Sequence, residues 1–333
     1  MRKDHQTKNR MLQIGILLIR HYKLLSLAAI TDVLETVNKI YHNGQQAAPF
    51  HINLVYTKEM AHLTAAFPGY ASQSIDEAGN FGLVLIPSFT TENLAASVAA
   101  NKDYLPWLRQ QYQNGAELAS FCTGAFLLGA SGLLDGKIAT THVDACKEFN
   151  RAYPAVTLMP DKIVTHDTRI YTSGGATSTF HLLLHLLEGY CGIEIAVRTA
   201  KIFAVDMGRD RQWYFSTFQP VRNHHDDLVA TAQLKIESCY QDVATIEEMI
   251  KDIPSSRRNI VRRFKQVTGV TPIEYLQHTR IEAAKKLLEQ TGQQMAEVIY
   301  NSGYNDPKAF RKVFRKTVGM TPSEYREKFN TVR

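Results

Sequence analysis

Short apolar runs alternate with amphipathic stretches along the chain up to about residue 204. The runs have the length of strands and lie at Gln13–Ile19, Ile52–Tyr56, Gly82–Pro87, Leu118–Phe121, Lys137–Thr141 and Arg169–Thr172. Helical patterns lie between them, at Leu27–Tyr41, Leu94–Asn114, Ala125–Gly132 and Ala176–Gly189. Near-continuous apolar strands separated by helices predict a mostly parallel sheet covered on both faces, an α/β sandwich.

From Leu228 onward, strand patterns are absent and every periodic stretch is helical. The stretch before it mixes polar and aromatic residues and is typical of a linker. We therefore predict a basic tail at residues 1–10, an α/β domain at 11–205, a linker at 206–227 and an all-α domain at 228–333.

The all-α domain contains an internal repeat with a period of 50 residues. Phe264–Tyr275 matches Phe314–Tyr325 without gaps, with six identities in twelve positions. In each copy, the segment Thr-Pro-x-Glu predicts an N-cap, a proline at the first helical position and a capping box. A glycine two residues earlier, Gly269 or Gly319, is expected to end the preceding helix.

Each preceding helix has an apolar face and a basic face. The basic residues are Arg258 and Arg262 in the first copy and Lys308, Arg311 and Lys312 in the second. A short amphipathic helix lies before each, so the pattern predicts two helix-turn-helix motifs. A connecting helix from Pro272 to about Gln290 would hold them apart. The alternative is a plain helical bundle with a solvated basic face.

Charge separates the two halves of the chain. Residues 1–227 hold 20 basic and 20 acidic residues, whereas residues 228–333 hold 18 and 12, the whole excess of +6. A basic domain on a neutral partner favours a polyanion such as nucleic acid, although such an excess also serves solubility alone.

Other classes of protein are excluded by composition. The sequence contains no run of 18 apolar residues, which excludes a membrane-spanning helix. Its polar N-terminus is not typical of a secretion signal. The four cysteines show neither disulfide-framework nor zinc-finger spacing. We expect a reduced, cytoplasmic protein without cofactor or metal. His181 and His185 have metal-binding spacing, but they lack cysteine or acidic partners, which favours structural histidines.

The C-terminal third, about residues 228–330, resembles the AraC/XylS family of transcription regulators. The resemblance rests on S-S-R-R-N-I-V-R-R-F-K-Q-V-T-G in the first motif and G-Y-N-D-P-K-A-F-R-K-V-F-R-K-T-V-G-M-T-P-S-E-Y-R in the second. It implies sequence-specific binding of double-stranded promoter or operator DNA. The residues that it implies for DNA contact are Arg257, Arg258, Val261, Arg262, Lys308, Arg311 and Lys312.

The first two hundred residues resemble the ThiJ/PfpI branch of the class I glutamine amidotransferase-like proteins, which implies a flavodoxin-like fold. The resemblance rests on A-S-F-C-T-G-A (119–125), G-L-L-D-G-K-I-A-T-T-H (132–142) and T-S-G-G-A-T-S (172–178). The first segment is typical of a nucleophile elbow, with Cys122 on a strained turn between a strand and a helix. A ligand pocket is expected there, lined by Cys122, Thr123, Gly124, His142, Ser173, Gly174 and Gly175.

Three departures argue against catalysis at this elbow. Thr123 stands where protease-like members have histidine, Ser26 where others have a carboxylate, and His181 where the family has an acid. We therefore expect a non-enzymatic, GlxA-type regulator that senses a small metabolite through a degenerate amidase-like domain. The alternatives are a cysteine-dependent amidase or hydrolase with an appended DNA-binding domain, and an inert buried Cys122. Expected partners are DNA, a small effector and a second copy through the N-terminal domain, with RNA polymerase a further candidate and no membrane.

Overall fold

The computed structural model describes residues 11–89, 93–175, 177–208, 212, 218, 220–222, 224–242 and 245–331. The chain divides into two compact units, Met1–Gln212 and Trp213–Arg333. The predicted basic tail and much of the predicted linker lie outside the described residues, so the four predicted segments stay a prediction. Among the described residues, no helix is both long enough and apolar enough to cross a membrane.

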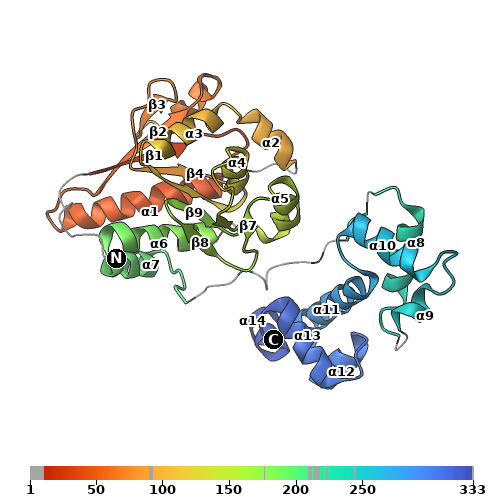
Figure 1. Cartoon of the computed structure of the whole chain (residues 1–333). Coiled ribbons are helices and arrows are strands. Elements are labelled where there is room, and N and C mark those ends of the chain that lie inside the picture. Colours follow the sequence, from red (N-terminus) through yellow and green to blue (C-terminus); the bar gives the residue numbers. More distant parts are fainter. Residues whose placement is uncertain are drawn as a thin grey trace. The chain divides into compact units, whose positions relative to one another are not determined.

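A seven-stranded sheet with the order β3-β2-β1-β4-β5-β9-β8 forms the centre of the first unit (Figure 1). Its strands are β1 (Leu12–Leu17), β2 (Phe50–Tyr56), β3 (Ala71–Ser74), β4 (Leu83–Ile86), β5 (Glu117–Ser120), β8 (Val164–Asp167) and β9 (Ile170–Ser173). All neighbours pair in parallel except β8 and β9. The mostly parallel sheet predicted from the apolar runs is therefore confirmed.

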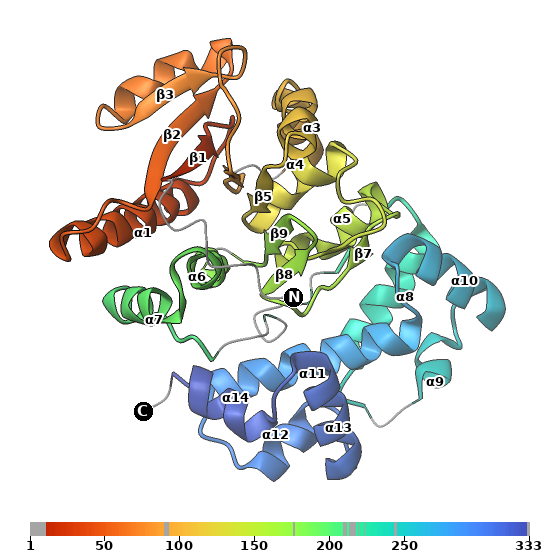
Figure 2. The same cartoon turned by 60° about the vertical axis from the view of Figure 1, so that its left-hand side comes forward.

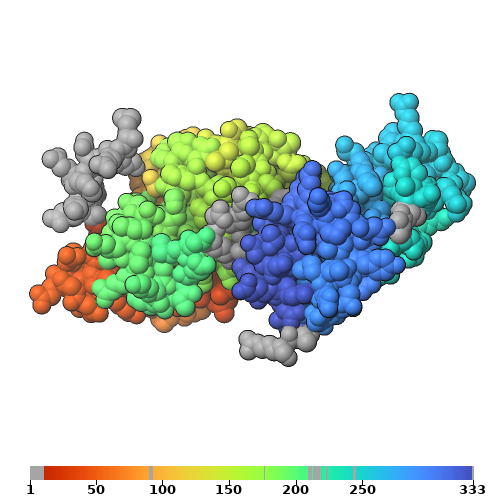
Figure 3. Space-filling model, turned by 90° about the horizontal axis from the view of Figure 1, so that it is seen from below, coloured from red at the N-terminus to blue at the C-terminus, as the bar shows by residue number. Residues whose placement is uncertain are grey.

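Helices cover both faces of this sheet, because the strand residues are apolar on both sides (Figure 2). One face packs against α1 (Leu24–Asn43), α6 (Ser178–Cys191) and α7 (Ile193–Ile202), whose outer surface is seen in Figure 3. The other face packs against α2 (Leu94–Ala100), α3 (Tyr104–Gln113), α4 (Ala125–Ala130) and α5 (Cys146–Ala152). Along β4, Leu83 and Leu85 enter the first core and Val84 and Ile86 the second. This alternation defines the sandwich.

Two predicted elements differ from the structure. The single helix expected over Leu94–Asn114 is two helices, because the buried Asn101 ends α2. Its side-chain amide donates to the carbonyl oxygens of Ser97 and Arg20, and its oxygen accepts from the Arg20 amide. The strand expected over Lys137–Thr141 shortens to β6 (Ile138–Ala139), which pairs with β7 (Thr157–Leu158) outside the seven-stranded sheet.

The second unit is entirely helical over its described residues, as predicted. Its helices are α8 (Asp227–Ser238), α9 (Ile246–Ile250), α10 (Arg257–Thr268), α11 (Pro272–Gln290), α12 (Met295–Asn301), α13 (Pro307–Val318) and α14 (Pro322–Phe329). They build two separate hydrophobic cores. One joins α8, α9, α10 and the start of α11, and the other joins the end of α11 to α12, α13 and α14.

The capping pattern of the repeat is confirmed at each predicted position. Thr271 and Thr321 cap α11 and α14 in complete capping boxes with Glu274 and Glu324. Gly269 and Gly319 take left-handed φ values of 79° and 85° at the ends of α10 and α13. A side chain there would be strained, so glycine is what allows these abrupt turns.

The repeat extends to tertiary contacts. Tyr275 and Tyr325, fifty positions apart, each donate a phenolic O–H to a glutamate of a neighbouring helix, Glu237 in α8 and Glu289 in α11. The two copies are thus equivalent in packing as well as in sequence.

Candidate functional site

The predicted elbow is present at the carboxyl edge of the sheet. Cys122 follows β5 with a φ of 54°, opens the 3-10 turn Cys122–Gly124 and leads into α4. Such a conformation costs about 1–3 kcal/mol in a residue other than glycine. A Cβ on Gly124 would lie 2.6 Å from the carbonyl oxygen of Pro87, so only glycine lets the turn approach the end of β4 this closely.

The thiol of Cys122 is not arranged as a nucleophile. The residue is 0% exposed, and burial raises the pKa of the thiol. The charge of Lys23 and hydrogen bonding from Thr123 act in the opposite direction, but burial is the larger effect. A thiol in this state is protonated at neutral pH and weakly nucleophilic.

Thr123, where the resemblance leads us to expect a histidine in protease-like members, forms a hydrogen bond with the backbone. Its hydroxyl oxygen accepts a hydrogen bond from the amide of Phe89 at 2.9 Å. It therefore ties the elbow to the loop after β4 and provides no base.

His142 follows a residue that contacts the elbow. The hydroxyl of the preceding residue, Thr141, donates to the carbonyl oxygen of Cys122 at 3.0 Å. Nδ1 of His142 accepts from the amide of Asp144 at 3.2 Å and lies 3.8 Å from its carboxylate. Burial is the largest influence on the imidazole and lowers its pKa, so the ring is neutral at pH 7. No hydrogen bond among the described residues joins His142 to the thiol of Cys122.

A lysine that the sequence analysis missed, Lys23, has its backbone at the same sheet edge. Its charge acts to lower the pKa of both Cys122 and His142. Lys23 follows β1, and its amide donates to the carbonyl oxygen of Ser88 after β4 at 2.7 Å. Ser26, where the resemblance leads us to expect a carboxylate in catalytic members, accepts a hydrogen bond from the amide of Ser88 at 3.2 Å.

The strand order explains why these loops meet. The chain order of the strands reverses between β1 and β4, and open α/β sheets bind ligands at such a switch point, beyond the carboxyl ends of the strands. The general rule could have pointed to the loop containing Lys23, but only once the strand order was known.

A second residue that the sequence analysis missed, Gln212, bonds to Ser173–Gly175, the last predicted segment of the pocket. Gln212 is 1% exposed, and its side-chain oxygen accepts from the amide of Gly175 at 2.8 Å. Its side-chain nitrogen donates to the carbonyl oxygens of Thr141 and Pro160. No signal in the sequence connects Gln212 with residues 140–175.

Three serine hydroxyls at this edge are buried without a hydrogen-bond partner among the described residues. They belong to Ser88 after β4, Ser120 at the end of β5 and Ser173 at the end of β9. These strands are neighbours and parallel, so their carboxyl ends lie together. Buried polar groups are nearly always paired, and unpaired ones at a sheet edge favour a site that a ligand or water completes.

The histidines of α6 have structural contacts. Nε2 of His181 lies 3.0 Å from the carbonyl oxygen of Asp206, and His185 packs against the rings of His166 and Tyr171. Within the part of the chain that the structure describes, no group of three histidine, cysteine or acidic residues could hold a metal.

The predicted basic residues of the second unit lie on α10 and α13, the two helices that end at Gly269 and Gly319. Arg258 and Arg262 of α10 are exposed, as are Lys308, Arg311 and Lys312 of α13. Val261 is half-buried. Ile260, Phe264, Phe310 and Phe314, on the opposite faces, are buried in the two cores.

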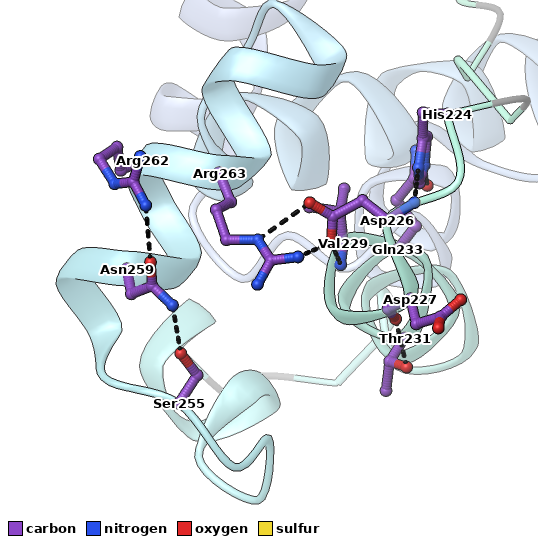
Figure 4. A network of polar contacts seen from close by, with 10 residues as sticks. All are labelled: His224, Asp226, Asp227, Val229, Thr231, Gln233, Ser255, Asn259, Arg262 and Arg263. Atoms are coloured by element: carbon purple, nitrogen blue, oxygen red, sulfur yellow. Dashed lines mark hydrogen bonds and ion pairs between the residues drawn. The ribbon is translucent and has the colours of Figure 1, made fainter.

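Neighbouring arginines of α10 point to different partners (Figure 4). The guanidinium of Arg262 donates to the side chain of Asn259, within the helix. Arg263 makes two hydrogen bonds, of 2.9 and 2.8 Å, to the carboxylate of Asp226, the N-cap of α8. Arg262 is therefore available to a ligand, whereas Arg263 joins two helices. Arg257 forms an ion pair with Glu247 of α9 and is only partly available.

A basic groove lies beside α13. Its volume is about 710 Å³, and it is lined by Met295, Arg311, Lys312, Arg315, Lys316, Thr321, Pro322 and Ser323. The start of α14 forms part of the lining, and the N-terminus of a helix attracts phosphate. The sequence analysis missed Arg315 and Lys316, although they follow Arg311 and Lys312 by one helical turn.

Comparisons with known proteins agree with this division. Residues 47–189 match the DJ-1/PfpI family, and residues 251–328 match a helix-turn-helix domain. The transcriptional regulator GbdR of Pseudomonas aeruginosa is 25% identical over 94% of this chain and 84% of its own. The regulator CdhR of the same species is 30% identical over 66% of each chain. The regulator GlxA of Rhizobium meliloti is 21% identical over 95% of this chain and 96% of its own.

Both domains occur here in the order expected from the two resemblances, on a fold that has the predicted elbow and the two predicted helix-turn-helix motifs. The matches to the named regulators GbdR and GlxA extend across both units. The chain belongs to the AraC-type helix-turn-helix transcriptional regulators with an N-terminal DJ-1/PfpI-like domain.

Proposed function

We propose that the first unit binds a small-molecule effector at the elbow and that this binding controls how α10 and α13 bind DNA. The observation that carries the proposal is the state of Cys122, whose buried thiol has a raised pKa and no base among its described hydrogen-bond partners. The fold of a cysteine enzyme is retained there without the arrangement that activates a thiol.

The surroundings of the thiol favour an anionic group on the effector. Lys23, whose backbone is bound at this sheet edge, would supply a positive charge there. Such a charge suits a carboxylate. The unpaired hydroxyls of Ser88, Ser120 and Ser173 would offer further hydrogen bonds at the same sheet edge.

A hydrolase is the weaker candidate for this unit. It would need His142 to take a proton from Cys122, but His142 accepts its described hydrogen bond from the amide of Asp144. We therefore propose that the protein is not an enzyme. Release of ammonia from small amides, measured for the wild type and Cys122→Ser, tests this point: turnover that disappears in Cys122→Ser would contradict it.

The decisive test of effector binding uses a bulky substitution at the elbow. Small carboxylates are screened for those that raise the melting temperature of the full-length protein, since a ligand of the native state stabilises it. Cys122→Trp should abolish the stabilisation and the change in DNA binding, whereas Cys122→Ser should alter both modestly. Ile193→Trp, at an exposed site on α7, is the bulky control. A full response in Cys122→Trp would place the effector elsewhere.

We further propose a cytoplasmic homodimer formed through the first unit. Leu24 and Leu25, at the start of α1, are 65% and 54% exposed and form adjacent apolar positions. Sedimentation of the wild type and of a Leu24→Glu/Leu25→Glu double variant tests the interface, which the charges should break. RNA polymerase stays a further candidate partner.

A further inference from the structure

Gln212 is held in the way that a bound ligand is held. Its backbone amide donates to the carbonyl oxygen of Asp161 at 3.0 Å, and its side chain is buried among Thr140, Thr141 and Gly175. The side-chain oxygen has one donor, the Gly175 amide. The nitrogen has three acceptors within 3.2 Å, namely the carbonyl oxygens of Thr141 and Pro160 and the hydroxyl of Thr140.

The groups that bind this carboxamide, which we call its seat, are the Gly175 amide, the carbonyl oxygens of Thr141 and Pro160 and the hydroxyl of Thr140. The hydroxyl of Thr140 donates to the carbonyl oxygen of Lys162 at 3.0 Å, which turns its lone pairs toward Gln212. A Cβ on Gly174 would lie 2.0 Å from the side-chain oxygen of Gln212, so the glycine leaves the space that the carboxamide fills. The φ of Gly174 lies outside the left-handed region, so backbone conformation does not require a glycine at this position.

The seat also adjoins the elbow. Thr141, which accepts from Gln212 through its carbonyl oxygen, donates through its hydroxyl to the carbonyl oxygen of Cys122. The carboxamide therefore lies next to the elbow, where the effector is proposed to bind.

We propose that Gln212 is an internal occupant of the effector site and that the effector, besides the anionic group proposed for the elbow, carries a planar carboxamide-like group that displaces Gln212. This inference rests on the proposed function, because it assigns chemistry and regulation to that same site. The matching group has an acceptor oxygen for the Gly175 amide and adjacent N–H donors for the carbonyl oxygens of Thr141 and Pro160. An amide, a urea or a related group has this pattern, whereas a carboxylate lacks the donors.

Displacement of Gln212 would reach the DNA-binding unit through the chain itself. Phe218, six positions later, stacks on His278 and meets the ring of Tyr275 edge-on within the second unit. Anchors at Gln212 and Phe218 leave only residues 213–217 between them. Displacement of Gln212 would remove one of these two anchors, and we expect this loss to change how ligand binding in the first unit affects the second.

The first experiment measures release by proteolysis of the full-length protein. Trypsin cleaves after Arg211, and a site whose next residue is anchored is cut slowly, because the chain must first detach locally. Gly174→Ala adds a methyl group where the carboxamide lies and leaves the sequence around the cleavage site unchanged. We expect cleavage at Arg211 to be about tenfold faster in Gly174→Ala and in Gln212→Ala. Gly189→Ala and Gln113→Ala, at exposed positions, are the matched controls and should cleave as the wild type does.

The second experiment measures whether the vacated seat selects amides. Propionamide carries the carboxamide and terminal carbons of a glutamine side chain, and propionate is its anionic counterpart. At tens of millimolar, propionamide should raise the melting temperature of Gln212→Ala by about 2 °C and leave the wild type unchanged. Propionate should have a smaller effect on the same variant.

The outcomes separate this inference from the proposed function. Unchanged trypsin cleavage in both variants, or stabilisation by propionate equal to that by propionamide, would overturn the role of Gln212. If Cys122→Trp still abolished the response to an effector, the effector site at the elbow would stand without it. If cleavage accelerated as expected but Cys122→Trp kept its full response, the proposed effector site itself would fail.

Discussion

Arg262 and Arg263 are adjacent in α10, and in the structure they have different hydrogen-bond partners. Arg262 is exposed on the face away from the core, and its guanidinium bonds only to Asn259 of its own helix among the contacts described. Arg263 bridges to Asp226. The sequence pattern alone does not separate the two, because both positions are basic and neighbouring.

Arg262→Ala should reduce discrimination between DNA sequences more than overall binding. If its guanidinium makes a bidentate contact to guanine, the loss is about 1–3 kcal/mol at that base pair. Fluorescence anisotropy with a specific and a scrambled duplex measures it. Lys265→Ala, near the end of α10, should weaken both duplexes alike, as a lost phosphate contact does. Equal losses on both duplexes for Arg262→Ala would show that α10 reads DNA through another face.

Arg263→Ala should lower stability rather than specificity. It removes two charge-assisted hydrogen bonds that hold the start of α8 to α10, and the side chain of Arg263 is more than a third exposed. After allowance for solvent screening, we expect a loss of about 1 kcal/mol. Urea unfolding of the second unit measures it, with Arg258→Ala as the control. Unchanged stability together with lost DNA specificity would reverse the two assignments.

Residues of the elbow were predictable to different degrees. Cys122, Thr123 and Gly124 follow from a local sequence pattern, and the structure shows the strained turn that this pattern indicates. Lys23 and Gln212 lie about a hundred positions away from Cys122 in opposite directions, and only the tertiary fold brings them to the same sheet edge. A local sequence pattern cannot predict which distant residues the fold brings together.

At the scale of elements, capping was the most reliable signal. Both Thr-Pro-x-Glu segments form the capping boxes expected from them, because the interaction is contained within four residues. Strands with weak patterns were not predicted: β3 (Ala71–Ser74) and β8 (Val164–Asp167) are short, largely polar edge strands. They form strands because they pair with the neighbouring strands β2 and β9, although most of their own residues have a low strand propensity.

The capping boxes predict a dependence of stability on pH. Hydrogen bonds from the threonine amides are the largest influence on Glu248, Glu274 and Glu324 and lower the pKa of each carboxyl group. A lowered pKa in the folded state gives stability that is present above the unfolded pKa, near 4.5, and is lost as the pH falls through the folded value.

We therefore expect the melting temperature of the second unit to fall as the pH is lowered from about 5 toward 3. Glu274→Gln and Glu324→Gln should each reduce this dependence, because the amide does not titrate. Glu327→Gln, outside the capping boxes, is the control. A melting profile that is identical for all four proteins would show that the boxes do not contribute through charge.

At the scale of the whole molecule, charge and fold divide the chain in the same way. The first unit carries the sheet and the elbow, and residues 228–333 carry the net charge of +6 and the two helices with exposed basic residues, α10 and α13. Helix α11, with 19 residues, is about 28 Å long, close to one turn of duplex DNA. One rod of this length can place α10 and α13 in successive segments of the major groove on one side of the duplex.

The most direct measurement is the salt dependence of DNA binding, for the full-length protein and for residues 213–333. Binding of promoter duplexes is followed by anisotropy at rising potassium chloride concentration. If about four of the exposed cations on α10 and α13 reach phosphates, log Kd should change with log salt by a slope of magnitude about 4, in both proteins. Arg311→Gln with Lys312→Gln should lower that slope by about 2. Affinity that is independent of salt, or unchanged when these basic residues are removed, would contradict the account of this chain as a regulator that binds DNA through its two helix-turn-helix motifs.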